Sequence, residues 1–307
     1  MRRLLIGMAC LVLLAGQVFA GGYQLKPEKI AENTYLVTGK LEDFSNRNGG
    51  NIVNTAFVVT EQGVVLFDTG PSRQYGEALR AAIAEVTNQP IVHVFNSHHH
   101  PDHFLGNQAF ADATIWALPE TGKQIAQHGD AFAENMYRLI GHWMKGTEVQ
   151  LPSKPLKQEE MDLGGHRFKF MTFTGHSGAD LVMLDQTTGV LFAGDLVFYQ
   201  RALTTPHTPG VANWVSDLRS LAKLDYKLLV PGHGPVNSGK ESIQQTIAYL
   251  SWLDQTLKTA AEQGLEMTEV IGLTPDPAFN QLKVRRSEFT RTVAHLYPEY
   301  EERAFTQ

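Results

Sequence analysis

Short apolar runs, each ended by glycine, proline or polar residues, recur along most of this chain. They are four to eight residues long and rich in β-branched and aromatic side chains, a pattern that predicts β-strands. We expect strands at residues 34–37, 55–60, 64–67, 91–95, 114–117, 166–173, 181–184, 190–193 and 227–230.

Segments with a helical spacing of apolar residues lie between these strands. Such spacing follows Ser72 and recurs around Trp214, residues 119–145 indicate a longer irregular helix, and the region after Lys240 is mostly helical. Strands that alternate with helices predict an α/β architecture in layers. The same order of elements occurs on both sides of the proline-rich segment 151–155, which we interpret as a seam rather than a firm domain boundary.

The strand at 91–95 runs directly into Ser97-His98-His99-His100-Pro101-Asp102-His103. Pro101 disfavours helix in the residue before it, so the histidines leave the strand in an extended conformation. Residues two apart in extended chain point the same way, so His98 and His100 can converge on one point. Asp102 and His103 follow past the bend and can face a second point nearby. This density of ligand-type side chains favours a metal site over a solvated turn.

Three later strand ends each carry one more ligand-type side chain beside a glycine: His176, Asp195 and His233. Glycine lets the backbone turn sharply and approach a metal closely. Each of them alone could be an ordinary polar turn. Together with the first motif they make five histidines and two aspartates, enough for two metal ions that share a bridging ligand.

Other candidates near these positions have structural interpretations. His99 should point away from the metals, by the alternation of extended chain, and either pack or contact a ligand. Asp68, which follows the strand at 64–67, either caps the turn or orients a metal-bound histidine. We interpret His128, His142 and Trp143 as surface or packing residues.

The composition fits a globular domain. The 307 residues are 43% hydrophobic and carry a net charge of −6, with no basic cluster beyond the N-terminus. Such a chain can bury an ample core. Its charge argues against nucleic acid or an anionic membrane as a partner.

The N-terminus has the pattern of a signal peptide. Two arginines precede an apolar run from Leu4 to Leu14, and a small-residue cleavage pattern ends at Ala20. We therefore expect a signal peptide at residues 1–20, export to the periplasm by the general secretory route, and a mature chain at 21–307 that is not membrane-bound. Its removal takes away two arginines and no acidic residue, so the net charge of −6 becomes −8.

Cys10 is the only cysteine, and it lies within this signal. The mature chain should therefore have no disulfide, no thiolate ligand and no cysteine nucleophile. Any metal must then be held by histidine and carboxylate, a ligand set that suits Zn²⁺ and also accepts iron or manganese.

The ordered set of His-x-His-x-Asp-His, Gly-His, Gly-Asp and Pro-Gly-His-Gly resembles the metallo-β-lactamase fold superfamily across residues 30–240. The resemblance implies a four-layer αββα sandwich in a single domain at 21–307, with a helical C-terminal extension from residue 240 onward. It also implies two metal ions bridged by Asp195. The remaining ligands would be His98, His100 and His176 for one ion, and Asp102, His103 and His233 for the other.

The aspartate at position 195 indicates which groups of the superfamily the chain resembles. The first two metallo-β-lactamase subclasses have cysteine at that position and the third lacks the bridging aspartate, whereas the dinuclear glyoxalase II and lactonase groups keep it. A narrower similarity is to the quinoprotein relay system zinc metallohydrolases. It is carried by residues 57–72, 100–110, 192–198 and 288–297. That similarity implies a periplasmic protein associated with a quinoprotein dehydrogenase system.

The function that these features imply is a periplasmic dinuclear zinc metallohydrolase acting on a small molecule. A metal-bridging hydroxide, oriented by Asp102 as the catalytic residue, would attack an ester, thioester or lactone-type carbonyl. His207, Tyr199 and Arg201 follow Asp195 and are candidates for substrate selection. No oligomeric state follows from these patterns.

Three alternatives stay open. A mono-iron persulfide-type dioxygenase would use the same fold, but the complete second ligand set argues against it. A metallo-β-lactamase is disfavoured by Asp195. A non-catalytic periplasmic accessory protein would keep the site for structure or metal handling.

Overall fold

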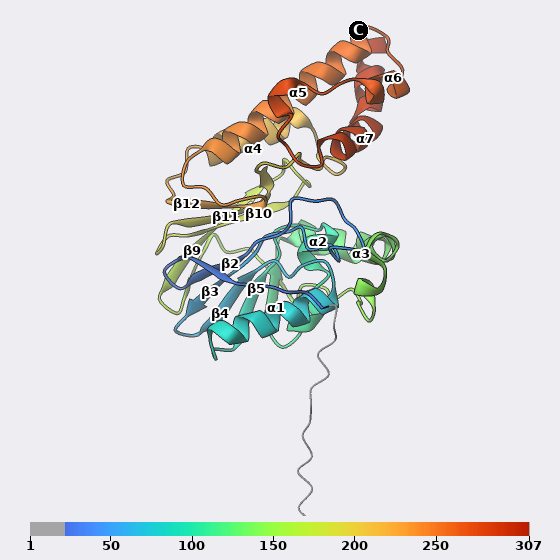
Figure 1. Cartoon of the computed structure of the whole chain (residues 1–307). Helices are drawn as coiled ribbons and strands as arrows, with labels where there is room; N and C mark the ends of the chain where they lie inside the picture. Colours follow the sequence, from blue (N-terminus) through green and yellow to red (C-terminus); the bar gives the residue numbers. More distant parts are fainter. Residues whose placement is uncertain (1–21, 307) are drawn as a thin grey trace, which may run out of the picture.

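Two β-sheets pack face to face in the computed structural model, which describes residues 22–306, and helices cover both outer faces (Figure 1). The predicted signal peptide, with Cys10, lies outside the described residues. Within residues 22–306, no helix is both long and apolar enough to cross a membrane.

The first sheet comes from the N-terminal half of the chain and holds seven strands in sequence order. Its strands pair antiparallel up to β4, and the later strands are added in parallel. They are β1 (Glu28–Ala31), β2 (Thr34–Val37), β3 (Thr55–Thr60), β4 (Gly63–Phe67), β5 (Ile91–Phe95), β6 (Thr114–Ala117) and β7 (Lys154–Pro155).

The second sheet has the strand order β12-β11-β10-β9-β8. β11 and β12 are parallel, and the other neighbours are antiparallel. Its strands are β8 (Glu160–Leu163), β9 (His166–Phe173), β10 (Asp180–Asp185), β11 (Val190–Phe198) and β12 (Leu228–His233).

The strands predicted from the sequence are confirmed, but β1 and β8 are additional and β12 continues to His233 instead of ending at residue 230. Two further features differ. β11 continues to Phe198 instead of ending at Ala193, because Gly194 adopts a φ of +52° and forms an irregularity in the pairing with β12. The end of the proline-rich segment pairs with β6 as β7. The predicted seam therefore closes the first sheet before the chain enters the second.

Helices connect the strands and cover the sheets. α1 begins after Ser72, as predicted, and the Ser72 hydroxyl accepts the backbone N–H of Tyr75 at 3.2 Å. The helices are α1 (Arg73–Val86), α2 (Pro101–Phe104), α3 (Pro119–Ile140), α4 (Val211–Leu221), α5 (Glu241–Glu262), α6 (Met267–Gly272) and α7 (Arg285–Phe305), with 3-10 turns η1 (Asn107–Phe110), η2 (Gly141–Met144) and η3 (Pro277–Phe279).

Three apolar cores hold the layers together, because alternate residues of a central strand face opposite sides. In β4, Val65 and Phe67 face the space between the sheets, whereas Val64 and Leu66 pack toward α1. The outer face of the second sheet packs in the same way against α4, α5 and α7. Figure 1 shows these helices beyond the second sheet and α1 beyond the first. The predicted four-layer αββα sandwich with a helical C-terminal part is confirmed.

Candidate metal centre

The predicted turn after β5 brings its ligand-type side chains to one place. The chain leaves Phe95 in an extended conformation and reaches His100 (φ −72°, ψ 146°), where Pro101 starts α2. Two buried asparagines stabilise the turn through side-chain hydrogen bonds. Asn96 and Asn107 exchange side-chain hydrogen bonds of 3.0 and 2.8 Å. These asparagines are residues that the sequence patterns did not single out.

The second sheet supplies the other three predicted ligands, although the expectation that Asp195 ends a strand is wrong. Asp195 lies within β11, directly after the irregularity at Gly194, and that bend turns its carboxylate out of the regular strand alternation. Gly232 makes room for it, because a Cβ atom there would lie 1.9 Å from Asp195 Oδ1. His233 ends β12, and His176 follows β9 in a tight loop.

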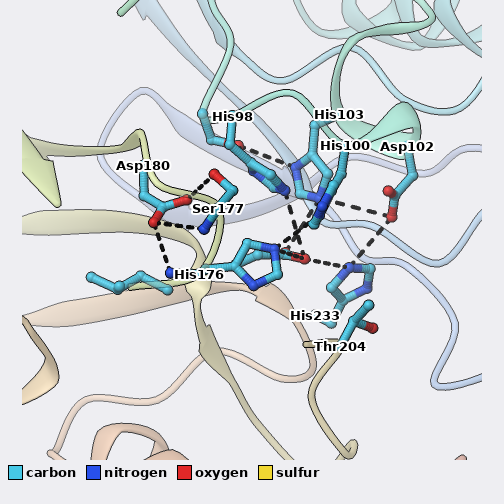
Figure 2. Close-up of polar contacts among 12 residues, drawn as sticks. His98, His100, Asp102, His103, His176, Ser177, Asp180, Thr204 and His233 are labelled. Atoms are coloured by element: carbon cyan, nitrogen blue, oxygen red, sulfur yellow. Dashed lines mark hydrogen bonds and ion pairs between the residues drawn. The ribbon is translucent and has the colours of Figure 1, made fainter. Parts of the chain in front are cut away.

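All seven predicted ligand residues are buried in one cluster, and they fall into two groups as the family resemblance implies. One group consists of His98, His100, His176 and Asp195, and the other of Asp102, His103 and His233. Within each group, one candidate ligand atom per residue lies within 4.8 Å of the others. Figure 2 shows the five imidazole rings and Asp102 directed toward a common centre.

Asp195 is the side chain that lies between the two groups. Its Oδ2 atom is 3.5 Å from His176 Nε2 and 4.0 Å from His98 Nε2. The same oxygen is 3.3 Å from His233 Nε2, while Oδ1 is 3.3 Å from His103 Nε2. A single carboxylate therefore reaches both groups, which is the geometry that a bridging ligand needs.

The donor atoms of the cluster fit divalent cations. His98 Nε2, His103 Nε2 and Asp195 Oδ1 are buried and have no hydrogen-bond partner among the described residues. Buried polar atoms without partners cost free energy, and coordination to a cation would offset that cost. The set contains imidazole nitrogen and carboxylate oxygen without sulfur, which suits zinc.

The electrostatics of the cluster favour neutral imidazole rings in the first group of ligands. Burial, together with the neighbouring imidazoles, holds the pKa of His98 and of His100 well below its ordinary value. Burial likewise lowers the pKa of His176 to about 3. At neutral pH these rings are therefore uncharged and offer a nitrogen lone pair to a cation.

Carboxylates surround His103 of the second group. Burial would lower the pKa of His103, but the carboxylates of Asp195, Asp102 and Asp68 outweigh it and raise that pKa well above its ordinary value. Burial would raise the pKa of Asp195, yet His233 and His103 hold it well below its usual range. A position where carboxylates favour a proton on an imidazole is a position where a metal cation is also favoured.

Asp68, which the sequence allowed either to cap a turn or to orient a histidine, contacts a histidine of the cluster. Its Oδ2 atom accepts a hydrogen bond of 2.7 Å from His103 Nδ1, and its two oxygens also accept from the Ser97 N–H and hydroxyl, each at 2.7 Å. Ser97 Oγ in turn lies 2.9 Å from His98 Nδ1. Asp68 therefore orients histidines of both groups and leaves their Nε2 atoms facing the centre.

Asp180, which sequence patterns did not single out, holds the loop that carries His176. Its Oδ2 atom accepts the backbone N–H of His176 at 2.8 Å and of Ser177 at 3.1 Å, as Figure 2 shows. Trp214 packs against the His176 ring with a centroid distance of 4.9 Å. A side chain four residues beyond a Gly-His loop has no distinctive spacing, so only the fold reveals this role.

A cavity of about 280 Å³ opens beside the cluster and includes His100, Asp102, Asp195 and His233 in its lining. Of the proposed selection residues, His207 and Arg201 line this cavity, whereas Tyr199 is not among the described residues that do. His207 Nδ1 lies 2.7 Å from His100 Nε2. The loop between β2 and β3 also reaches the cavity, through Asp43 and Phe44.

The remaining histidines are arranged largely as expected. His99 is buried beside Phe132 and His207, with ring centroids at 5.7 and 5.2 Å, so it packs at the edge of the site. His99 and His207 can form a further ligand-type group, but only together with His100. His128 and His142 are exposed, and Trp143 packs against Tyr23.

A known protein family matches more than half of this chain. The family described as the metallo-beta-lactamase superfamily matches residues 48–233, which covers the turn after β5 and extends to the end of β12. The helices α5, α6 and α7 lie beyond the matched region.

Two curated proteins resemble the chain over most of its length. A linear primary-alkylsulfatase from Pseudomonas sp. (strain ATCC 19151) is 21% identical over 73% of this chain, which spans only 48% of that protein. Metallo-beta-lactamase IND-1 from Chryseobacterium indologenes is 26% identical over 64% of this chain and 78% of its own length.

Solved structures of similar fold include a metallo-beta-lactamase from Pontibacter korlensis, with a TM-score of 0.61 and 20% identity. The match covers 74% of this chain and 99% of that one. Metallo-beta-lactamase IND-7 matches with a TM-score of 0.60 and 22% identity, over 74% of this chain and 98% of its own. At these identities the likeness shows the fold.

Proposed function

Because the chain belongs to the metallo-beta-lactamase superfamily, whose members are metal-dependent hydrolases, we propose that it is an exported dinuclear zinc hydrolase of ester, thioester or lactone carbonyls. The observation that carries this proposal is the position of Asp195 between two complete groups of buried ligand atoms. A structural role alone would not favour so many unpaired nitrogen and oxygen atoms directed at one centre.

Two divalent cations in this cluster would supply a water of near-neutral pKa as the nucleophile and an electrophile for the carbonyl oxygen. The residues of the chain position that chemistry. Asp102 lies where the cluster meets the cavity, with its Oδ2 atom 3.4 Å from His233 Nε2. From there its carboxylate would accept a hydrogen bond from the attacking water and orient the water toward the substrate. The leaving group would be protonated by solvent that enters the cavity.

The location and partner belong to the same proposal. The arginine pair and apolar run at the N-terminus support export to the periplasm. The similarity of residues 100–110 and 192–198 to the quinoprotein relay group supports association with a quinoprotein dehydrogenase system. N-terminal sequencing of protein from a periplasmic fraction tests the first point. Co-purification with a quinoprotein dehydrogenase tests the second.

A broad turnover screen tests the reaction. Zinc-loaded protein should hydrolyse at least one neutral ester, thioester or lactone. A β-lactam and a linear primary alkyl sulfate belong in the same panel, because the curated relatives carry those names. Turnover of the β-lactam or alkyl sulfate alone would reassign the substrate. No turnover by protein with a full complement of zinc would favour the accessory role.

Asp102→Ala is expected to lower kcat by at least about 100-fold, because it removes the carboxylate that orients the nucleophile. The variant should keep the fold, since Asp102 lies at the cavity and outside the apolar cores. The measurement is kcat on the best substrate of the panel, with circular dichroism as the control for folding. Activity within a few-fold of the wild type would refute the role of Asp102.

A further inference from the structure

The cavity beside the metal centre has two unlike walls. One wall is apolar and comes from the loop around Phe44, the start of α2, the helix α3 and the loop before His207. Leu139 on α3 keeps 39% of its surface exposed and lines the cavity, so it can contact a ligand there. The Phe132 ring lies 5.7 Å from the His207 ring and 6.4 Å from the His100 ring. The apolar wall consists of Phe44, Ile52, Pro101, Phe132, Leu139 and Pro206.

The second wall carries charges that neutralise one another. Arg201 Nη2 donates to Glu288 Oε1 at 3.0 Å. Arg291 donates to the same Glu288 oxygen at 3.0 Å and to Asp43 Oδ2 at 2.6 Å. The four side chains line the cavity as two cations and two anions. We name them the ion-paired wall.

The pairing leaves no free cation for an anionic substrate on this wall. The Arg201 side chain is buried, and its other contacts are the carbonyls of Ala202 at 3.0 Å and Glu42 at 3.5 Å. The Arg291 side chain is 39% exposed, but both of its terminal nitrogens form ion pairs, one with Asp43 and one with Glu288. A substrate carboxylate would have to displace Asp43 or Glu288, or lie beside them unpaired, and both cost free energy.

Half of the ion-paired wall comes from α7, which lies outside the region that matches the family. Glu288 and Arg291 are three residues apart and therefore lie on one face of this helix. The C-terminal helices thus do more than cover the second sheet, because α7 closes one side of the cavity at the metal centre. The cavity is consequently a feature of this chain rather than of the shared sandwich alone.

We propose that this cavity selects substrates whose carbonyl carries a neutral apolar group, and that it discriminates against isosteric anions. The inference rests on the proposed hydrolase function for the chemistry, but the selection itself resides in the two walls. The apolar group would lie against Phe132 and Leu139 while the carbonyl faces the metal centre. The volume of about 280 Å³ fits a short alkyl or aromatic acyl group.

Binding of ligands that are not hydrolysed tests the selection without requiring turnover. Zinc-loaded protein is titrated by calorimetry with 2-butanone, with 2-octanone and with 7-oxooctanoate, which replaces the terminal methyl group of 2-octanone by a carboxylate. We expect 2-octanone to bind at least about 10-fold more tightly than 2-butanone, because it buries additional methylene groups. The carboxylate should bind at least about 10-fold more weakly than 2-octanone.

Variants on α3 separate the cavity from a general surface effect. Leu139→Ala should weaken 2-octanone binding about 5-fold and leave 2-butanone within about 2-fold, since it removes apolar contact beyond the carbonyl. Tyr137→Ala is the matched control. Tyr137 is on the same helix and 60% exposed, but it does not line this cavity. It should leave both affinities unchanged.

Turnover is measured in parallel as kcat/KM for p-nitrophenyl hexanoate and acetate. A higher value for hexanoate that falls in Leu139→Ala supports the selection. Equal binding of the two ketones, tighter binding of 7-oxooctanoate, or a Tyr137→Ala effect as large as that of Leu139→Ala would overturn it. Chain-length-dependent ketone binding without any ester turnover would support the selection and contradict the hydrolase function alone.

Discussion

Each of the five clustered histidines keeps one ring nitrogen toward the centre, and four of them use the other nitrogen for a fixed partner. His103 donates to Asp68 at 2.7 Å and His233 to the carbonyl of Ile52 at 2.7 Å. These oxygens only accept, so both rings carry their proton on Nδ1 and leave Nε2 free for a cation. His98 Nδ1 lies 2.9 Å from Ser97 Oγ. His100 has the reverse arrangement, because its Nε2 atom lies 2.7 Å from His207 Nδ1 and its Nδ1 atom faces the His176 ring. The tautomers that His103 and His233 need for metal binding are therefore set in advance by the chain.

Asp68→Asn is expected to weaken zinc binding by about 10- to 100-fold, because it replaces the carboxylate that orients His103. Asparagine keeps the shape of the side chain and tolerates the left-handed backbone of residue 68, where φ is +61°. The measurement is a competition titration with a chelator. An unchanged zinc affinity would show that Asp68 only caps the turn.

At the scale of elements, a buried carboxylate adds a polar link between α7 and the sandwich to the apolar packing of that helix. Glu288 Oε1 accepts from Arg201 at 3.0 Å, Arg291 at 3.0 Å and the Thr204 hydroxyl at 2.9 Å. Arg201 and Glu288 are both buried. Since these residues are 87 apart in sequence, the bond ties the C-terminal helices to the loop after β11.

Removal of one partner of this pair should destabilise the protein strongly. Glu288→Ala is expected to lower the free energy of unfolding by about 3 kcal/mol, because it leaves Arg201 buried without a carboxylate. The double variant Arg201→Met with Glu288→Leu should recover part of that loss, since no unpaired charge remains. Urea unfolding of the three proteins measures the cycle. Equal stability of Glu288→Ala and the wild type would contradict the attachment of α7 by this pair.

The hairpin of β9 and β10 carries a second buried polar pair, at the end away from the loop that holds His176. Asp185 Oδ2 accepts from His166 Nδ1 at 2.8 Å and from the Thr188 hydroxyl at 2.7 Å. Burial would raise the pKa of Asp185, but these hydrogen bonds outweigh it and hold the pKa below its ordinary value. The stabilisation from this group is therefore present above the unfolded-state pKa of about 3.9 and is lost as pH falls through the lower folded-state pKa.

Asp185→Asn should consequently destabilise the protein by about 1–3 kcal/mol at pH 7, since the ionised acceptor is lost. The difference between wild type and variant should shrink as pH falls below about 4, where the wild-type carboxylate takes up a proton. Urea unfolding at pH 7, 5, 4 and 3 measures this difference. A difference that is constant with pH, or that grows in acid, would contradict the assigned role.

At the scale of the whole molecule, the face-to-face packing of the sheets is what completes the site. The first sheet supplies the ligands of the turn after β5, and the second supplies His176, Asp195 and His233. The apolar core between the sheets fixes the two sets of ligands relative to each other. In this core the ring centroids of Phe67 and Phe192 lie 5.6 Å apart. Neither half alone has both groups of ligand atoms.

The sequence predicts the strands, the layers and the seven clustered residues because each rests on a local pattern. Short apolar runs rich in β-branched and aromatic residues identify strands, and ligand-type residues beside glycine or proline identify turns. The rest depends on contacts between distant segments. Asp43 meets Arg291 across 248 positions, and Arg201 meets Glu288 across 87, so no local spacing indicates the ion-paired wall. The sequence alone indicates a strand end at Asp195, because the irregularity at Gly194 that lets β11 continue depends on the pairing of β11 with β12.

The metal content of the purified protein tests the central claim most directly. Elemental analysis of protein isolated without added metal, repeated after reconstitution with zinc, gives the number and kind of ions per chain. The bridging position of Asp195 predicts about two zinc ions per chain, falling to about one or fewer in Asp195→Ala, with ester or thioester hydrolysis lost in parallel. A single iron per chain and no zinc, before and after reconstitution, would contradict the dinuclear hydrolase.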